Sequence, residues 1–362
     1  MTAKSLWIVF LVGLMCSAHA QENPGAATSD AGYTVTINSK KSLTFLGSLD
    51  SFEITEAGTQ AGKFLLDYLE GDPKDPALLD LSSKIYDRII PLENYGGEYT
   101  ALQWFAWYFQ ADEKKRKEML SNRYVKGFFD YMAANDFDEL RYYIRNKYHL
   151  AEKVQSGDPE KALDRERFLE DFILFNNPRR EEWEASSKML SVLDLEAGDT
   201  IVDVGSGPGY FSFQFSDMVG AKGKVYAEDT VKKHLDYIEG LMGQHNIDNI
   251  ETVHGDIDDI KIPENVADIV FLCSLYHVIY LTSFEDVKDR FIASIKKAMK
   301  PDGILFLADN AFVTDEELSY HGPYIARGLI IAQLKYYGFD LVAEHSFIPQ
   351  RYILIFKQRE EG

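Results

Sequence analysis

Residues Thr200–Ser212 read TIVDVGSGPGYFS and give the clearest structural signal in the chain. The first five residues are β-branched or apolar apart from one aspartate, which predicts a buried strand. Gly205, Gly207 and Gly209 follow at alternate positions, and an aromatic-rich segment that opens with Tyr210 predicts a helix. Glycine suits such a turn because it tolerates positive φ and lets a ligand approach the backbone. A strand, a glycine turn and a helix N-terminus together predict a ligand-binding loop.

Downstream of this loop, strands and helices alternate. We expect strands over Lys224–Ala227, Ile250–His254, Ala267–Leu272 and Ile304–Ala308, and helices over Val231–Met242, Phe284–Met299 and Pro323–Tyr337. Strands separated by helices predict βαβ units and a parallel sheet. Phe339–Ser346 and Arg351–Lys357 are joined by a short turn, so this final pair is expected to be antiparallel. The sequence therefore predicts an α/β fold with a Rossmann-like sheet.

The chain upstream of the loop has a helical pattern. Predicted helices cover Ala61–Glu70, Leu78–Ile90 ended by Pro91, Glu98–Gln110, Lys126–Ala134, Glu139–Tyr148 and Pro159–Phe175. The aromatic cluster at Trp104–Phe109 predicts a buried core, with a substrate wall as the alternative. Asn176-Asn177-Pro178 marks a boundary, after which Arg179–Leu193 predicts one amphipathic helix. We expect a mainly α-helical domain of unknown role at 21–178 and a sheet domain at 179–362.

Charge restricts the partners. The 362 residues carry a formal net charge of −20, which disfavours nucleic acid and anionic lipid surfaces. The densest basic run, Lys114–Lys117, has acidic neighbours and predicts a solvated helix face. No apolar run in the mature chain is long enough to predict a membrane span.

Residues 1–20 predict a secretory signal peptide. Lys4 precedes a largely apolar run, and Ala18-His19-Ala20 forms an A-x-A cleavage site. We therefore expect an exported protein, either periplasmic or secreted. Cleavage would leave Cys273 as the single cysteine of the mature chain, which excludes an intramolecular disulfide.

Acidic residues follow the strands after the glycine loop. Asp229, beside Glu228, comes a little over twenty residues after Gly205, where a carboxylate can accept ribose hydroxyls. The alternative is that these two acids stabilise the N-terminus of the next helix. Asp256 is a candidate acceptor for an adenine amine, with Ile257 packing on the ring, or else a simple turn residue.

Five motifs resemble a class I S-adenosylmethionine-dependent methyltransferase of the small-molecule type. They are VDVGSGPGYFS at Val202–Ser212, VYAEDT at Val225–Thr230, HGDI at His254–Ile257, ADIVFLCSLYHV at Ala267–Val278 and KPDGILFLAD at Lys300–Asp309. PRREEWEASSKML at Pro178–Leu190 resembles the lead-in helix of such enzymes. The resemblance covers about half of the chain and implies seven strands, the last antiparallel.

The resemblance also implies a cofactor site for S-adenosyl-L-methionine. The glycines of the loop, together with Ser206, would wrap the methionine part, and Asp203 would orient the loop or approach the amino group. Asp229 and Glu228 would serve the ribose, and Asp256 and Ile257 the adenine. Tyr210 and Cys273 complete the set as candidate pocket residues.

His277 and Tyr276, at the carboxyl edge of the predicted sheet, are the candidate catalytic residues. A hydroxyl or amine acceptor can require a base, and His277 is the best candidate for it. The alternative is that both side chains only shape the pocket. Asp309-Asn310 resembles part of a catechol-type magnesium site, but no third acid accompanies the pair, so we predict no metal.

We therefore expect methyl transfer from S-adenosylmethionine to a small-molecule acceptor. A catalytically silent ligand-binding protein with the same fold is one alternative, and a nicotinamide-dependent oxidoreductase is another. The G-x-G-x-G spacing and the antiparallel end disfavour the latter. The acceptor and the oligomeric state are not determined by the sequence.

Overall fold

The computed structural model describes residues 25–28, 34–37, 41–45, 51–93, 97–150, 159–282, 284–311, 324–348 and 350–359. The predicted signal peptide lies outside these residues. Across the described part of the chain, no helix has both the length and the apolar character that crossing a membrane requires.

Two short hairpins come first. β1 (Gly25–Thr28) pairs with β2 (Thr34–Ile37), and β3 (Lys41–Phe45) pairs with β4 (Ser51–Thr55), both antiparallel. The alternating pattern of Tyr33–Ile37 predicts a short strand, and β2 corresponds to it. Residues 21–32 are rich in small and polar residues and predict a disordered leader, and this prediction is wrong at Gly25–Thr28, where β1 lies.

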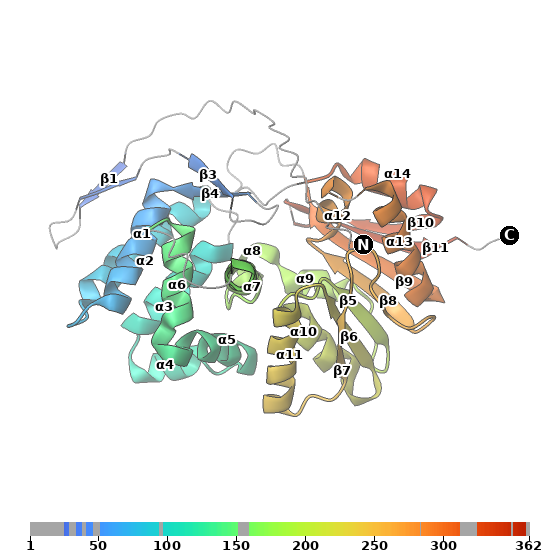
Figure 1. The fold of residues 1–362 in the computed structure, drawn as a ribbon, viewed down its shortest axis with the longest axis horizontal. Coiled ribbons are helices and arrows are strands. Elements are labelled where there is room, and N and C mark those ends of the chain that lie inside the picture. Colours follow the sequence, from blue (N-terminus) through green and yellow to red (C-terminus); the bar gives the residue numbers. More distant parts are fainter. Residues whose placement is uncertain are drawn as a thin grey trace, which may run out of the picture.

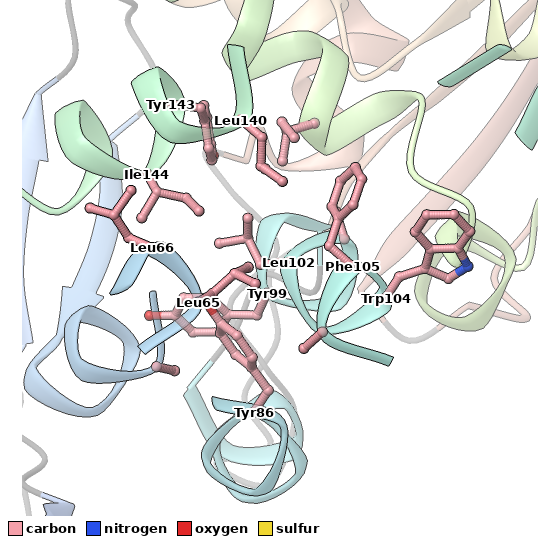
Figure 2. Packing of buried hydrophobic residues seen from close by; sticks show 14 of the residues in the cluster. Leu65, Leu66, Tyr86, Tyr99, Leu102, Trp104, Phe105, Leu140, Tyr143 and Ile144 are labelled. Atoms are coloured by element: carbon pink, nitrogen blue, oxygen red, sulfur yellow. The ribbon is translucent and has the colours of Figure 1, made fainter. Parts of the chain in front are cut away.

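The helical half follows and holds one aromatic core. Its elements are α1 (Glu56–Glu70), α2 (Pro76–Glu93), α3 (Gly97–Gln110), α4 (Glu113–Met119), α5 (Arg123–Ala133), the 3₁₀ turn η1 (Ala134–Phe137), α6 (Asp138–Lys147) and α7 (Pro159–Phe175). Leu65, Leu102 and Phe105 lie at the centre of the bundle, where α1, α3 and α6 meet (Figure 2). Trp104 and Phe105 are buried, which confirms the core interpretation of the aromatic cluster for these two residues.

Two local predictions need correction, and a third holds. α2 continues past Pro91 to Glu93, which is tolerated because a proline so close to the helix end removes one hydrogen bond at most. The expected helix Arg179–Leu193 is two short helices, α8 (Arg180–Glu184) and α9 (Ser186–Ser191), because Ala185 adopts φ 47°. The basic run at Lys114–Lys117 lies in α4, as expected, with Asp112 capping its N-terminus.

In the described residues, seven strands form one sheet in the order β10-β11-β9-β8-β5-β6-β7. The strands are β5 (Thr200–Val204), β6 (Lys224–Asp229), β7 (Ile250–His254), β8 (Ala267–Cys273), β9 (Met299–Asn310), β10 (Phe339–His345) and β11 (Arg351–Gln358). The β5–β6, β6–β7, β5–β8 and β8–β9 pairs are parallel. β11 is antiparallel to both β9 and β10, which confirms the predicted fold class with its reversed last strand.

Helices cover both faces of this sheet. Alternate residues of β5 point to opposite faces, so Ile201 packs in one apolar cluster while Val202 and Val204 pack in the other. α10 (Tyr210–Val219) and α11 (Lys232–His245) supply the first cluster, and α13 (Glu285–Ala298) and α14 (Arg327–Tyr336) the second. The result is a three-layer domain whose strand ends carry the loops (Figure 1).

The helical half docks on the α10–α11 face of the sheet domain. Tyr124 of α5 stacks on Phe213 of α10 with ring centroids 4.8 Å apart. Phe172 of α7 meets Tyr237 of α11 edge-on at 4.9 Å, and the Asn176 side chain donates to the Tyr237 hydroxyl at 3.3 Å. These aromatic contacts stabilise the packing of the helical half against the sheet domain.

Candidate functional site

The candidate site residues lie where the parallel strands end at their carboxyl edge. β5 is the centre of the sheet, with β6 on one side and β8 on the other. The chain runs outward from β5 through β6 to β7, then crosses back to β8 and runs outward to β9. This reversal makes β5 and β8 a topological switch point, where ligands bind in open α/β sheets.

The glycine turn follows β5 directly. Gly207, at its middle, has φ 53°, and a Cβ built there would meet no atom within 4 Å among the described residues. A side chain at this position would therefore strain the backbone and fill the open space in front of the turn. A Cβ at Gly209 would instead lie 2.8 Å from Ile238 Cγ1, so that glycine is needed for packing against α11. The Ser206 N–H donates to the Glu228 carbonyl at 2.8 Å, which joins the turn to β6.

Asp203 lies beneath the turn on β5 and is buried. The Ser212 hydroxyl donates to its Oδ2 at 2.6 Å, which joins β5 to the first turn of α10. Burial raises the pKa of Asp203 to about 7, although this hydrogen bond and the nearby Arg180 favour the charged form. Asp203 is therefore placed to brace the loop from below.

Asp229 ends β6 and lies against the glycine turn. Its Oδ2 accepts from the Gly207 N–H at 2.8 Å, and its Oδ1 accepts from the Val231 N–H at 2.7 Å, just before α11. His234 Nδ1 lies 3.2 Å from Oδ2. Burial disfavours the charge, but His234 and these N–H groups hold the pKa of Asp229 below its usual value. Asp229 thus accepts a hydrogen bond just before α11, as expected if it stabilises the helix N-terminus. It also contacts the glycine turn, as expected if it binds the cofactor.

Glu228 differs from its neighbour Asp229 in the direction of its pKa shift. It is buried, and its Oε2 accepts a long hydrogen bond of 3.4 Å from the Gly205 N–H. Burial, followed by repulsion from Asp229, raises the pKa of Glu228 well above its usual range. At the end of β6, the surroundings therefore favour the charged form of Asp229 and disfavour the charged form of Glu228.

Asp256 and Ile257 follow β7 at the same edge and face solvent. Asp256 pairs with Lys261 at 2.8 Å between Nζ and Oδ2, and the Ile257 side chain is 53% exposed. The exposed side chains of Ile257 and Asp256 are both accessible to an adenine ring from the solvent. The adenine role of the two residues stays a prediction.

Cys273 ends β8 in a buried ionic cluster. Glu184 of α8 lies between Arg180 and Arg351, with Arg351 Nη2 3.0 Å from its Oε1. All three side chains are nearly inaccessible, and Arg351 also donates to Cys273 Sγ at 3.3 Å. Burial, with Glu184 nearby, raises the pKa of the Cys273 thiol to about 12, so it stays protonated. We call Arg180, Glu184 and Arg351 the arginine corner.

Tyr210 joins the arginine corner to the glycine turn. The Arg180 guanidinium lies over its ring at 4.3 Å from the centroid, and its hydroxyl is 2.8 Å from Ser186 Oγ. The first residue of α10 therefore faces the lead-in helices, which brings α8 and α9 against the carboxyl edge.

His277 and Tyr276 begin α12 (Tyr276–Thr282), after β8. His277 Nδ1 lies 2.7 Å from Asp309 Oδ1, and its backbone N–H donates to Oδ2 at 2.8 Å. Asp309, at the end of β9, is fully buried, and so it fixes the position of the imidazole. The Tyr276 hydroxyl donates to Gln333 Oε1 at 2.6 Å, and burial raises the pKa of Tyr276 well above its usual value.

Asp309 is thus a partner of His277. The sequence had suggested a role for Asp309 only as part of a metal site. Across the described ranges, no three His, Cys, Asp or Glu side chains gather so that they could hold a metal ion. The Asn310 N–H donates to Asp309 Oδ1 at 2.7 Å, so the acid already serves three groups.

Sequence reasoning missed the arginine corner. Arg180 and Glu184 are four residues apart, a spacing that places them on one helix face, and this signal was available within PRREEWE at Pro178–Glu184. Arg351 carried no such signal because it comes from β11, far along the chain. His234 was also missed, since its partners lie on β6 and on α7.

Comparisons with known proteins agree with this geometry. Residues 195–343 match the family model described as a methyltransferase domain. The chain is 32% identical over 110 residues to protein arginine N-methyltransferase PRMT10 of Arabidopsis thaliana, covering 30% of this chain and 27% of that protein. It is 29% identical over 116 residues to the ubiquinone/menaquinone biosynthesis C-methyltransferase UbiE of Francisella tularensis, covering 32% and 44%. The chain thus spans less than half the length of either relative.

The chain is also similar to a solved structure over part of its length. The crystal structure of a SAM-dependent methyltransferase from Aquifex aeolicus covers 56% of this chain and 98% of its own, with 23% identity and a TM-score of 0.43. The family model and the seven-stranded sheet identify the C-terminal half as a class I S-adenosylmethionine-dependent methyltransferase domain. S-adenosyl-L-methionine is the cofactor of this class.

Proposed function

We propose that the protein transfers a methyl group from S-adenosylmethionine to a small-molecule acceptor. The observation that carries the proposal is the glycine turn after β5 with Asp229 hydrogen-bonded to its middle N–H. The turn has positive φ and open space in front of Gly207, and a charged carboxylate lies at the end of the next strand. In this proposal, these features form the binding site for an adenosyl group.

The donor set suits both ends of this cofactor. Asp229 would accept from the ribose, with Asp256 and Ile257 at the adenine. The methionine part would extend past the glycines toward Tyr210. The arginine corner, with two guanidinium groups around one carboxylate, lies on that side and suits the cofactor's own carboxylate. When bound, S-adenosylmethionine supplies an electrophilic methyl group on a sulfonium.

His277 is the better of the two candidate bases. If Nδ1 donates its proton to Asp309, Nε2 is the ring nitrogen that would act as the base. Nε2 can then take the proton that a hydroxyl or amine acceptor loses as its new bond to carbon forms. Tyr276 is a poor base because it is neutral at any physiological pH, and its hydroxyl already donates to Gln333. Its role in this proposal is to shape the pocket.

The burial of His277 favours a small acceptor. Its side chain is 4% exposed and that of Tyr276 2% exposed, so a reacting atom must enter beside them. A peptide acceptor needs an open groove for its backbone. The similarity to the plant arginine methyltransferase supports a protein acceptor as the second candidate.

Calorimetric titration of the purified chain tests the proposal. Heat on addition of S-adenosylmethionine is expected, and none on addition of NADH. The reverse result would replace methyl transfer by nicotinamide chemistry. Methyl transfer is then assayed with labelled cofactor on a panel of small hydroxyl, amine and carbon acceptors, and on arginine-rich protein. Cofactor binding without transfer to any of them would favour a silent binding protein, and labelling of protein alone would refute the small-molecule acceptor.

We also propose that the protein is exported. The support is the charged start, apolar run and A-x-A site of residues 1–20. Mass spectrometry of the protein isolated from its own cells is expected to find Gln21 as the first residue. An N-terminus that retains residues 1–20 would refute export by cleavage.

A further inference from the structure

We infer that the helical half completes the cofactor site: Asp171 of α7 holds His234, and His234 in turn holds the Asp229 carboxylate in place. The inference rests on the proposed function, in which Asp229 receives the ribose. It gives a role to the N-terminal half of the chain. Asp171 is then a positioning residue for the cofactor, although it lies outside the methyltransferase domain.

The geometry forms one continuous chain of charges. His234 lies in the first turn of α11, with Nδ1 3.2 Å from Asp229 Oδ2 and Nε2 3.3 Å from Asp171 Oδ2. The contacts lack straight hydrogen-bond angles, so attraction between opposite charges carries them. Each ring nitrogen thus faces a carboxylate, one from the sheet and one from the helical half.

Two neighbouring carboxylates, those of Asp229 and Asp171, stabilise the protonated form of the His234 imidazole. The His234 ring is almost fully buried, and Phe168 of α7 lies beside it at 5.6 Å between ring centroids. Burial alone disfavours a charged imidazole, yet the two aspartates outweigh it and raise the pKa of His234 to about 10. Without Asp171, His234 would lose one of the two charges that keep it cationic.

The charge on His234 matters to Asp229 because the carboxylate is buried as well. The imidazolium is the largest favourable influence on the pKa of Asp229, ahead of the N–H groups of Val231 and Gly207. A cation in that place fixes the side chain at the mouth of the glycine turn, so less order has to be gained when the cofactor binds.

Contacts on either side of Asp171 pack α7 against α11. Phe172, one residue after Asp171, meets Tyr237 one turn further along α11. Asn176 also bonds to the Tyr237 hydroxyl. These contacts, close to Asp171 in sequence, hold this part of the chain against α11.

The test measures S-adenosylmethionine affinity in the full-length chain by calorimetry. Asp171→Asn keeps the shape and removes the charge, and we expect it to weaken binding about 5- to 20-fold, the lower range of coupling between sites. Asp217→Asn is the matched control, because Asp217 pairs with Arg123 across the same interface at 2.7 Å but belongs to α10, remote from Asp229. The control is expected to bind as the wild type does.

A double-mutant cycle separates positioning from general damage. If Asp171 acts through Asp229, Asp171→Asn adds no further loss in an Asp229→Asn background. Asp171→Glu, which retains the charge, is expected to bind within about twofold of the wild type. Melting without cofactor checks that each variant is folded.

The outcomes are distinguishable. A wild type that does not bind S-adenosylmethionine overturns the proposed function and this inference together. A wild type that binds, with Asp171→Asn binding equally well, overturns the inference alone. Equal losses from Asp171→Asn in both backgrounds would assign Asp171 a structural role and also overturn it.

Discussion

Each half of the molecule buries a cluster in which one charge faces two of the opposite sign. In the sheet half, Glu184 lies between Arg180 and Arg351. In the helical half, Lys147 Nζ lies 4.0 Å from Glu98 Oε1 and 3.6 Å from Glu170 Oε1. The three residues of the second cluster come from α3, α6 and α7, and all are nearly inaccessible.

The two clusters differ in what surrounds them. The arginine corner borders Tyr210 and Cys273, at the carboxyl edge of the sheet where the other candidate site residues lie. The Lys147 cluster lies among tyrosines inside a helix bundle, where Tyr143 and Tyr99 also belong to the core (Figure 2). Buried charge alone therefore does not mark a functional site, and its position at the carboxyl edge of the sheet is the informative part.

The largest effect on activity is expected from substitution of His277, which lies at the carboxyl edge of the sheet, compared with a buried charge of the helical half. His277→Gln should lower kcat by about 10²- to 10⁴-fold, the usual contribution of a general base, and leave cofactor affinity unchanged. Lys147→Met, at a buried charge of the helical half, should leave kcat unchanged at a temperature where it is folded. A kcat that falls less than tenfold in His277→Gln would make the histidine a residue that only shapes the pocket.

Glu184 and Lys147 can be compared through stability. Glu184→Gln leaves two buried guanidinium groups without their shared carboxylate, and Lys147→Met leaves two buried carboxylates without the ammonium. Each is expected to lower the free energy of unfolding by about 3–5 kcal/mol in urea titrations. Glu184→Gln should also weaken S-adenosylmethionine binding, whereas Lys147→Met should not. Equal effects of the two substitutions on cofactor affinity would contradict the distinction between the clusters.

Asp229→Ala tests the ribose assignment. The loss of a buried charged acceptor should weaken S-adenosylmethionine binding by about 1–3 kcal/mol in a calorimetric titration. Asp236→Ala serves as the control, because Asp236 is an exposed acid on α11 that pairs with Lys232. An Asp229→Ala variant with wild-type affinity would remove Asp229 from the cofactor site.

The most gradual effect expected is a pH dependence due to Asp203, spread over about three pH units. Its pKa is raised to about 7 from its usual value of 3.8, so the folded state binds the proton more tightly than the unfolded chain does. Asp203 should therefore make stability fall as pH rises from about 4 to 7, with a slope of at most about 1.4 kcal/mol per pH unit. Asp203→Asn should remove this slope in urea titrations at several pH values, and an unchanged profile would contradict the raised pKa.

Much of the sheet half was predictable because its signals are local. The buried strands, the glycines at alternate positions and the acids at strand ends follow one another within short stretches, and β7 was predicted with its observed bounds. The same locality explains the failures. The break at Ala185 has no glycine or proline to announce it, and Pro91 is tolerated because of where the helix ends.

By itself the sequence determined the class of the domain, the reversed last strand and the set of loop residues that could hold the cofactor. Only the tertiary structure decided the partners of the charged groups. Asp309 meets His277, Arg351 meets Glu184 and Asp171 meets His234, because distant elements dock against one another. Charge states follow from the same packing, since burial and neighbouring charges separate the pKa of Glu228 from that of Asp229 although the two acids are adjacent in sequence.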